Sequence, residues 1–267
     1  MAVTTGLAAV PSVLEASAVD VFALADARRV HTRVACGAPT GMAMALALRR
    51  PRAGAPALEL AAGYESGHVA VMRNAGERRW ETVYLAQPHS QPVLSLAVYP
   101  GGAAFLTTAA DSLVVRHPLG EDGQAKVVDT RHLGLQGVSI RGDGKLFATA
   151  GWDARFRVFS GRSMKELAVL KWHGVGCYAV DFAEILDDDD DAHDAGMASG
   201  GSAQVGHGDG GDTAPGSEAV CTQGGQASEL FRAANLSVEA SRVRRESRRH
   251  WIAGGAKDGK VSMWEIY

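Results

Sequence analysis

The chain contains 267 residues, with 27 basic and 30 acidic side chains, a formal charge of −3 and 46% hydrophobic residues. This composition is ordinary for a protein with an apolar core, and it gives no overall electrostatic attraction to nucleic acid or to an anionic membrane. The three cysteines, Cys36, Cys177 and Cys221, are far apart and lack CxxC spacing, which disfavours a disulfide framework and a structural zinc site.

The N-terminal residues give only weak signals. Residues 1–18 are apolar in patches and lack the basic region of a secretory signal. No run of about 18 apolar residues, the length that indicates a membrane span, occurs in the chain. We therefore predict an N-terminal tail over residues 1–18. A single strand, the remnant of a further repeat unit, is predicted near residues 19–24.

Four segments then share one pattern with a period near 42 residues. In each segment a turn residue stands six positions before a bulky or aromatic residue, and a short alternating run typical of a β-strand lies between them. The segments are residues 63–72, 109–117, 151–159 and 256–264. The turn residues are Ser66, Asp111, Asp153 and Asp258, and the residues six positions later are Met72, His117, Phe159 and Trp264.

A histidine precedes each aspartate of this pattern. The distances are 22, 21 and 85 residues for the pairs His89 and Asp111, His132 and Asp153, and His173 and Asp258. The last distance exceeds the first by 63 residues. The spacing from Asp153 to Asp258 exceeds the spacing from Asp111 to Asp153 by the same number of residues. Both markers predict that one long loop interrupts the last repeat.

Four short strands per unit of about 40 to 45 residues, with Gly and Asp at the turns, are typical of a β-propeller blade. We predict an all-β chain with about four blades, formed by residues 19–184 and 250–267. In such a blade the His and the turn Asp hydrogen-bond across strands, and removing one partner costs on the order of 1 to 3 kcal/mol. Asp153 belongs to this pattern, whereas Trp152 is an additional residue of its own blade. Because blade structure already explains the regular His and Asp spacing, a catalytic triad has no independent support.

Several segments resemble the WD-repeat family and, more narrowly, the ASTRA-associated protein 1 family, also described as guanine nucleotide-binding protein β-subunit-like. They are FATAGWDARFRVF (147–159), MKELAVLKWH (164–173), AGGAKDGKVSMWEIY (253–267), LELAAGYESGHVAVM (58–72) and HSQPVLSLAV (89–98). The resemblance covers about residues 19–182 and 250–267. It implies a seven-bladed propeller of which about four blades are present, so the chain resembles the C-terminal part of such a protein. We expect an open arc with exposed edges, or an incomplete gene model of a longer protein.

The resemblance also implies a non-catalytic scaffold for protein–protein interactions. Its implied partners are the ASTRA complex, which is linked to chromatin remodelling, the TTT co-chaperone assembly, and the phosphatidylinositol 3-kinase-related kinases that TTT helps to mature. Neither a cofactor nor a metal is expected, and the same holds for GTP, direct nucleic-acid contact and membrane contact. The cysteine pattern fits a reducing compartment, so we expect the protein in the nucleus, the cytoplasm or both.

Two other functions remain open. One is a G-protein β-like signalling propeller, which should carry an N-terminal coiled-coil helix, although no heptad run precedes the first blade here. The other, which is less favoured, is a propeller enzyme with catalytic groups that converge at the central channel.

Three short motifs resemble known functional motifs but do not indicate those functions. Residues 254–261 almost spell a P-loop, but Val261 stands where a Ser or Thr must reach magnesium, so we predict a hairpin turn instead. Arg141-Gly-Asp143 matches an integrin tripeptide but is interpreted as a tight turn between strands. His193 and His207 lie near Asp residues without a fixed ligand geometry, and we interpret them as incidental.

Residues 185–249 differ in composition from the rest of the chain. An acidic run over residues 187–191 leads into a stretch rich in Gly, Ser and Ala, for which we predict disorder. Residues 227–249 have helix-forming composition and end in a basic run of Arg242, Arg244, Arg245, Arg248 and Arg249. This run is a candidate nuclear-import or acidic-partner patch, but a solvated loop is the favoured interpretation by about two to one.

Overall fold

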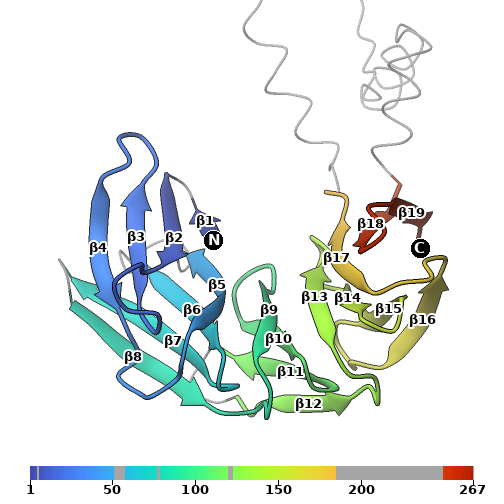
Figure 1. Cartoon of the computed structure of the whole chain (residues 1–267), viewed down its shortest axis with the longest axis horizontal. Coiled ribbons are helices and arrows are strands. Elements are labelled where there is room, and N and C mark those ends of the chain that lie inside the picture. The colour runs from blue at the N-terminus through green and yellow to red at the C-terminus, as the bar shows by residue number, and fades with distance from the viewer. Residues whose placement is uncertain (5, 51–57, 77–78, 120–122, 185–248, 267) are drawn as a thin grey trace, which may run out of the picture. The chain divides into compact units, whose positions relative to one another are not determined.

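The computed structural model describes residues 1–4, 6–50, 58–76, 79–119, 123–184 and 249–266. These residues form antiparallel β-sheets, and no helix among them could span a membrane. The chain divides into two units, residues 1–183 with 251–267, and residues 184–250. All of the strands that the described residues form belong to the first unit (Figure 1).

Five sheets follow one another along the chain, and in each sheet the neighbouring strands are also consecutive in sequence. The first sheet contains β1 (Ala2–Thr4), β2 (Leu7–Pro11), β3 (Val19–Ala23) and β4 (Arg29–Val34). The second contains β5 (Ala43–Arg49), β6 (Glu59–Tyr64), β7 (Val69–Gly76) and β8 (Arg79–Ala86). The third contains β9 (Val93–Val98), β10 (Ala104–Ala109), β11 (Leu113–Pro118) and β12 (Lys126–Asp129). The fourth contains β13 (Leu135–Ile140), β14 (Leu146–Gly151), β15 (Arg155–Ser160) and β16 (Glu166–Lys171), and the fifth contains β17 (Cys177–Phe182), β18 (Trp251–Ala256) and β19 (Val261–Glu265). These meanders are the blades of a WD-repeat propeller, so the predicted fold class is confirmed, although the described residues form five sheets where about four blades were expected.

The predicted N-terminal tail over residues 1–18 is wrong. Residues 2–4 and 7–11 form β1 and β2, and Ala9 of β2 is paired with Val21 of β3 and fully buried. The strand predicted alone near residues 19–24 is therefore one of four in a complete sheet. The sequence signal was weak because β1 has only three residues and β2 contains Ala8, Ala9 and Pro11, which have low strand propensity.

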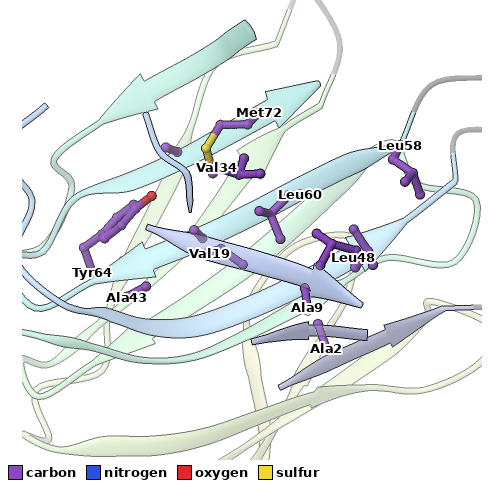
Figure 2. Close-up of a cluster of buried hydrophobic side chains, with 13 residues drawn as sticks. Ala2, Ala9, Val19, Val34, Ala43, Leu48, Leu58, Leu60, Tyr64 and Met72 are labelled. Atoms are coloured by element: carbon purple, nitrogen blue, oxygen red, sulfur yellow. The ribbon is translucent and has the colours of Figure 1, made fainter. Parts of the chain in front are cut away.

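Apolar clusters lie between consecutive sheets and hold them together. Figure 2 shows the cluster between the first and second sheets, where Val19 of β3 and Val34 of β4 lie near Leu60 of β6 and Met72 of β7. Phe105 joins the cluster between the second and third sheets, Phe147 the one between the third and fourth, and Ile252 the one between the fourth and fifth. Burying an aliphatic or aromatic side chain of this size contributes roughly 1.5 to 3 kcal/mol.

A long segment of the chain separates β17 from β18 within the fifth blade, at the place that the spacing predicted. Strand β17 ends at Phe182, which pairs with Ile252 of β18, so the chain leaves and re-enters the blade at adjacent strands. The predicted disorder of residues 185–249 lies almost entirely outside the described residues. The same is true of the basic run, of which only Arg249 is described.

Glycine at position 254 permits the fifth blade to pack on the fourth. A Cβ at Gly254 would lie 2.3 Å from the ring of Phe156, whereas a Cβ at the neighbouring Gly255 would meet only Ala179, at 3.9 Å. We expect Gly254→Ala to lower the free energy of unfolding by about 1–3 kcal/mol through this overpacking. Gly255→Ala is the matched control and should change it by less than about 0.5 kcal/mol. Urea unfolding measures both variants. An equal change in their free energy of unfolding would contradict this packing.

Candidate functional site

The structure brings together the two members of each His–Asp pair. Each histidine lies just before the first strand of its blade, and each aspartate lies in the turn between the next two strands. Nδ1 of His89 lies 3.1 Å from both carboxylate oxygens of Asp111. The corresponding Nδ1-to-carboxylate distances are 3.6 Å for His132 and Asp153 and 3.5 Å for His173 and Asp258. The first pair is thus a full hydrogen bond, while the other two are longer ion-pair contacts.

The pair in the third blade extends into a buried polar chain, which we call the relay. Nε2 of His89 lies 2.9 Å from the hydroxyl of Thr107, and the same hydroxyl lies 2.9 Å from Nε2 of His117. Nδ1 of His117 lies 2.9 Å from the hydroxyl of Tyr84, which belongs to the second blade. The relay therefore connects Asp111 to a neighbouring blade through four further side chains.

Burial keeps both histidines of the relay neutral near pH 7. It lowers the pKa of His89, although the Asp111 carboxylate acts in the opposite direction. For His117, burial and the nearby His89 lower the pKa to about 3. A neutral imidazole carries a single N–H, so each ring in the relay donates one hydrogen bond and accepts one.

These constraints fix the direction of every hydrogen bond in the relay. His89 donates from Nδ1 to Asp111, so its Nε2 accepts from the Thr107 hydroxyl. Thr107 has only one proton, so its oxygen accepts from Nε2–H of His117. Nδ1 of His117 then accepts from the Tyr84 hydroxyl. Each donor and acceptor along the relay has a partner, which is the condition for a buried polar network to be stable.

The Asp111, His89 and Thr107 arrangement resembles a catalytic triad in its order of carboxylate, imidazole and hydroxyl. Thr107 and His117 are fully buried, however, and His89 is 2% exposed. A substrate cannot reach the hydroxyl, which moreover already donates to His89 and accepts from His117. The relay is therefore a structural link between strands and blades.

In the fourth blade, different side chains stand at the positions of the relay residues. Phe159 occupies the position of His117; it is buried and stacked on Phe147 with ring centroids 4.9 Å apart. The hydroxyl of Thr149, at the position of Thr107, is buried without a hydrogen-bond partner. Instead, Arg157 donates two hydrogen bonds to Asp153, at 2.6 and 3.2 Å. Burial would raise the pKa of Asp153, but these bonds and the charge of Arg157 outweigh it, so the pKa is lowered.

In the fifth blade a serine on a different strand supplies the hydroxyl. Gly254 stands at the threonine position, and Ser262, its partner across the ladder, lies 2.7 Å from Nε2 of His173. Trp264 packs against Phe156 of the fourth blade in an edge-to-face contact with centroids 5.4 Å apart. Burial would raise the pKa of Asp258, but the backbone N–H of Lys260 and the side chain of His173 together lower it.

Sequence reasoning missed Thr107, Tyr84 and Arg157. A signal for the two threonines existed, because Thr107 and Thr149 each stand four residues before the turn aspartate of their blade. Tyr84 had no such signal, since it reaches the relay from the last strand of the preceding blade. Arg157 lies in the alternating run between Asp153 and Phe159, and that strand pattern does not indicate its contact with Asp153.

Other candidate motifs form turns. The P-loop-like segment is the hairpin between β18 and β19, closed by a hydrogen bond from Ala256 N to Lys260 O. Arg141 and Asp143 form an ion pair within the β13–β14 turn. His193 and His207 lie outside the described residues. Within the described ranges, no group of three or more His, Cys, Asp or Glu side chains could hold a metal ion.

Two shallow depressions lie on the described surface. One, of about 380 Å³, is lined by residues including Thr40, Gly41 and Glu65. The other, of about 430 Å³, is lined by residues including Tyr99 and Arg116. The residues that line the two depressions include no histidine and no cysteine.

Comparison with known proteins gives several close relatives, although no family model matches the chain. ASTRA-associated protein 1 of Aspergillus flavus is 42% identical over 98% of this chain and 59% of its own length. ASTRA-associated protein 1 of Pyricularia oryzae is 32% identical over 98% of this chain and 68% of its own length. Guanine nucleotide-binding protein subunit beta-like protein 1 of the mouse is 36% identical over 54% of this chain. The chain thus spans about three fifths of the length of the Aspergillus relative.

Proposed function

Because the chain belongs to the ASTRA-associated protein 1 family, we propose that it is a non-catalytic scaffold that assembles other proteins. Its partners in this proposal are components of the ASTRA complex and of the TTT co-chaperone assembly. Through them the protein would act in chromatin remodelling and in the maturation of phosphatidylinositol 3-kinase-related kinases. The relationship to proteins named for their association with ASTRA is the observation that carries this proposal.

The geometry of the blades supports a binding role over a catalytic one. The polar side chains that look most like catalytic machinery are buried and bonded to one another, as in the relay of Asp111, His89 and Thr107. What the blades offer to solvent is a set of loops on packed sheets, and loops on a rigid scaffold are common protein-binding elements. Propeller folds serve many functions, so the fold alone would not carry the proposal.

Affinity purification tests the proposed partners. The tagged chain, expressed in cells of its source, should recover TTT components and kinases of this class above the level of a tag-only control, measured by quantitative mass spectrometry. Recovery of neither group would contradict the proposed function. A hydrolase screen on the purified chain should remain at the background of the buffer.

Localisation in the nucleus, the cytoplasm or both is part of the same proposal. A fluorescent fusion of the chain should be compared with a deletion of residues 187–249, which removes the acidic and basic runs of the insert. Loss of nuclear signal in the deletion would assign import to the basic run. An unchanged distribution would favour the interpretation of the insert as a solvated loop.

A G-protein β-like signalling propeller is the second candidate, favoured by the name of the mouse relative. It requires a γ subunit as partner. Co-expression with candidate γ subunits followed by size-exclusion chromatography should leave the chain unbound if the scaffold proposal is right.

A further inference from the structure

Large apolar side chains are exposed in the loops at one end of the fourth and fifth blades. They lie before β13, in the β14–β15 turn, between β16 and β17, and at the start of β17. Between 40% and 70% of each side chain is exposed to solvent. We call the following residues the aromatic track: Leu133, Trp152, Trp172, Val175 and Tyr178.

Close packing holds the inner part of this track in place. The ring of Trp152 lies so near Gly134 that a Cβ there would fall 2.1 Å from it, and Gly134 has a φ of +78°. The indole N–H of Trp152 donates to Oε1 of Gln136 at 2.8 Å. On the other side, Gly176 lies between Trp152 and Tyr178, and a Cβ there would be 3.2 Å from the tyrosine ring. The contact with Gly134 and the hydrogen bond to Gln136 hold the Trp152 ring in place before any partner binds, which reduces the entropy lost on binding.

Trp172 forms the outer part of the track. Its ring meets His173 edge to face with centroids 4.7 Å apart, and the ammonium group of Lys260 lies 5.9 Å from its centre. Most of the indole nevertheless faces solvent, at 60% exposure. Aromatic side chains with a preset position are the residues that most often dominate binding energy at protein interfaces.

Cations surround the track. Arg131, Arg155 and Lys171 lie in or next to the turns that carry it, and Lys257 and Lys260 lie in the β18–β19 turn. Arg155 and Lys171 are partners on adjacent strands, and Lys171 directly precedes Trp172 in sequence. The backbone N–H of Lys257 donates to Gly176 O, which places this turn beside the track.

The carboxylates of the same turns are already engaged. Asp153 accepts hydrogen bonds from Arg157, and Asp258 contacts His173 and the backbone N–H of Lys260. The charge available to a partner is therefore mainly positive. A phosphate backbone carries uniform negative charge and would also meet these two carboxylates, whereas a peptide can place its acidic residues beside the lysines alone.

We propose that the aromatic track is the docking surface for a linear peptide segment of a partner protein that alternates acidic with aromatic or aliphatic residues. The apolar residues of the peptide would contact Trp152, Trp172 and Tyr178, and its carboxylates would pair with the surrounding lysines and arginines. This inference rests on the proposed scaffold function and specifies the chemistry of its partner.

Fluorescence anisotropy with a synthetic peptide tests the proposal on the full chain. The probe is a fluorescein-labelled peptide in which Glu alternates with Phe and Leu, and two further peptides replace Glu by Lys or the apolar residues by Ser. We expect binding of the first peptide only, with an affinity that falls as salt is added. Trp172→Ala and Lys260→Glu should each weaken binding by about tenfold or more.

Two exposed residues outside the track provide matched controls. Leu167 lies on β16 and is 57% exposed, and the side chain of Lys145 in the β13–β14 turn is 79% exposed. Leu167→Ala and Lys145→Glu should change the affinity by less than about twofold. Thermal unfolding of all four variants checks that each remains folded.

Three results would overturn the docking surface. One is equal affinity of the wild type, Trp172→Ala and Lys260→Glu for the Glu-containing peptide. Another is tighter binding of the Lys-containing peptide. The third is tighter binding of a fluorescein-labelled single-stranded oligouridine, which would assign the surface to nucleic acid.

Affinity purification separates this inference from the proposed function. If wild type and Trp172→Ala recover TTT components equally, the scaffold function stands and the docking surface is wrong. If the wild type recovers none, but peptide binding still depends on Trp172, the docking surface stands and the family-based partners are wrong.

Discussion

Thr107→Val is expected to lower the free energy of unfolding by about 2–5 kcal/mol, although the two side chains have nearly the same shape. The hydroxyl of Thr107 accepts from Nε2–H of His117 and donates to Nε2 of His89, and the residue is fully buried. Valine removes both hydrogen bonds and leaves a donor and an acceptor buried without partners. Each such group costs about 1–3 kcal/mol. Urea unfolding monitored by tryptophan fluorescence measures the effect.

Thr149→Val is the control at the equivalent position of the next blade. Thr149 is also fully buried, but its hydroxyl has no hydrogen-bond partner. Replacing it should therefore leave the free energy of unfolding unchanged or raise it by up to about 1 kcal/mol, because an unpaired buried hydroxyl is removed. An equal decrease in the free energy of unfolding in the two variants would contradict the directed hydrogen bonds of the relay. It would indicate that both threonines contribute by packing alone.

The second large effect is a loss of stability in mild acid. Burial and the neighbouring His89 lower the pKa of His117 to about 3, from a usual value of about 6.5, and burial lowers the pKa of His89 as well. The unfolded state therefore binds protons that the folded state excludes, so stability is full above about pH 6.5 and falls as pH decreases. Once pH is well below 6.5, His117 alone contributes a loss of about 1.4 kcal/mol per pH unit. Denaturant unfolding between pH 7 and 5 avoids the range, near and below pH 4, in which the carboxylates of Asp153 and Asp258 also titrate.

His117→Phe separates this titration from packing. Phe159 occupies the same position in the fourth blade, so a phenyl ring fits this place in a blade. The variant should be less stable at pH 7, because Thr107 and Tyr84 lose a partner, but its stability should depend less steeply on pH. If the free energy of unfolding depended equally steeply on pH in wild type and His117→Phe, the pKa of His117 would not differ between the folded and unfolded states.

The repeat markers were sufficient to predict most of the fold. Asp111, Asp153 and Asp258 mark turns that the sheet geometry requires, so their spacing placed the last three blades and located the interruption after Phe182. Strands β1 and β2 were missed because they are short and β2 contains Ala8, Ala9 and Pro11, which have little preference for a strand. Pairing of Ala9 with Val21 decides their structure, and such tertiary pairing is not visible in local sequence.

The polar interior was predictable in part. The His–Asp pairs follow from spacing, but no sequence pattern indicates that His117 continues the chain of hydrogen bonds while Phe159 ends it. That difference depends on Tyr84 of the preceding blade, a contact between residues 33 positions apart. The exposed track was also hidden, since only the fold brings Trp152, Gly176 and Tyr178 together. Trp152 was nevertheless distinguishable as a residue that the blade pattern does not require.

The proposed scaffold function is tested most directly by the abundance of phosphatidylinositol 3-kinase-related kinases in cells depleted of the protein. We expect the steady-state amounts of these kinases to fall on depletion, to recover when the wild-type chain is supplied, and to recover less with Trp172→Ala. Kinase amounts that do not change on depletion would contradict the central claim.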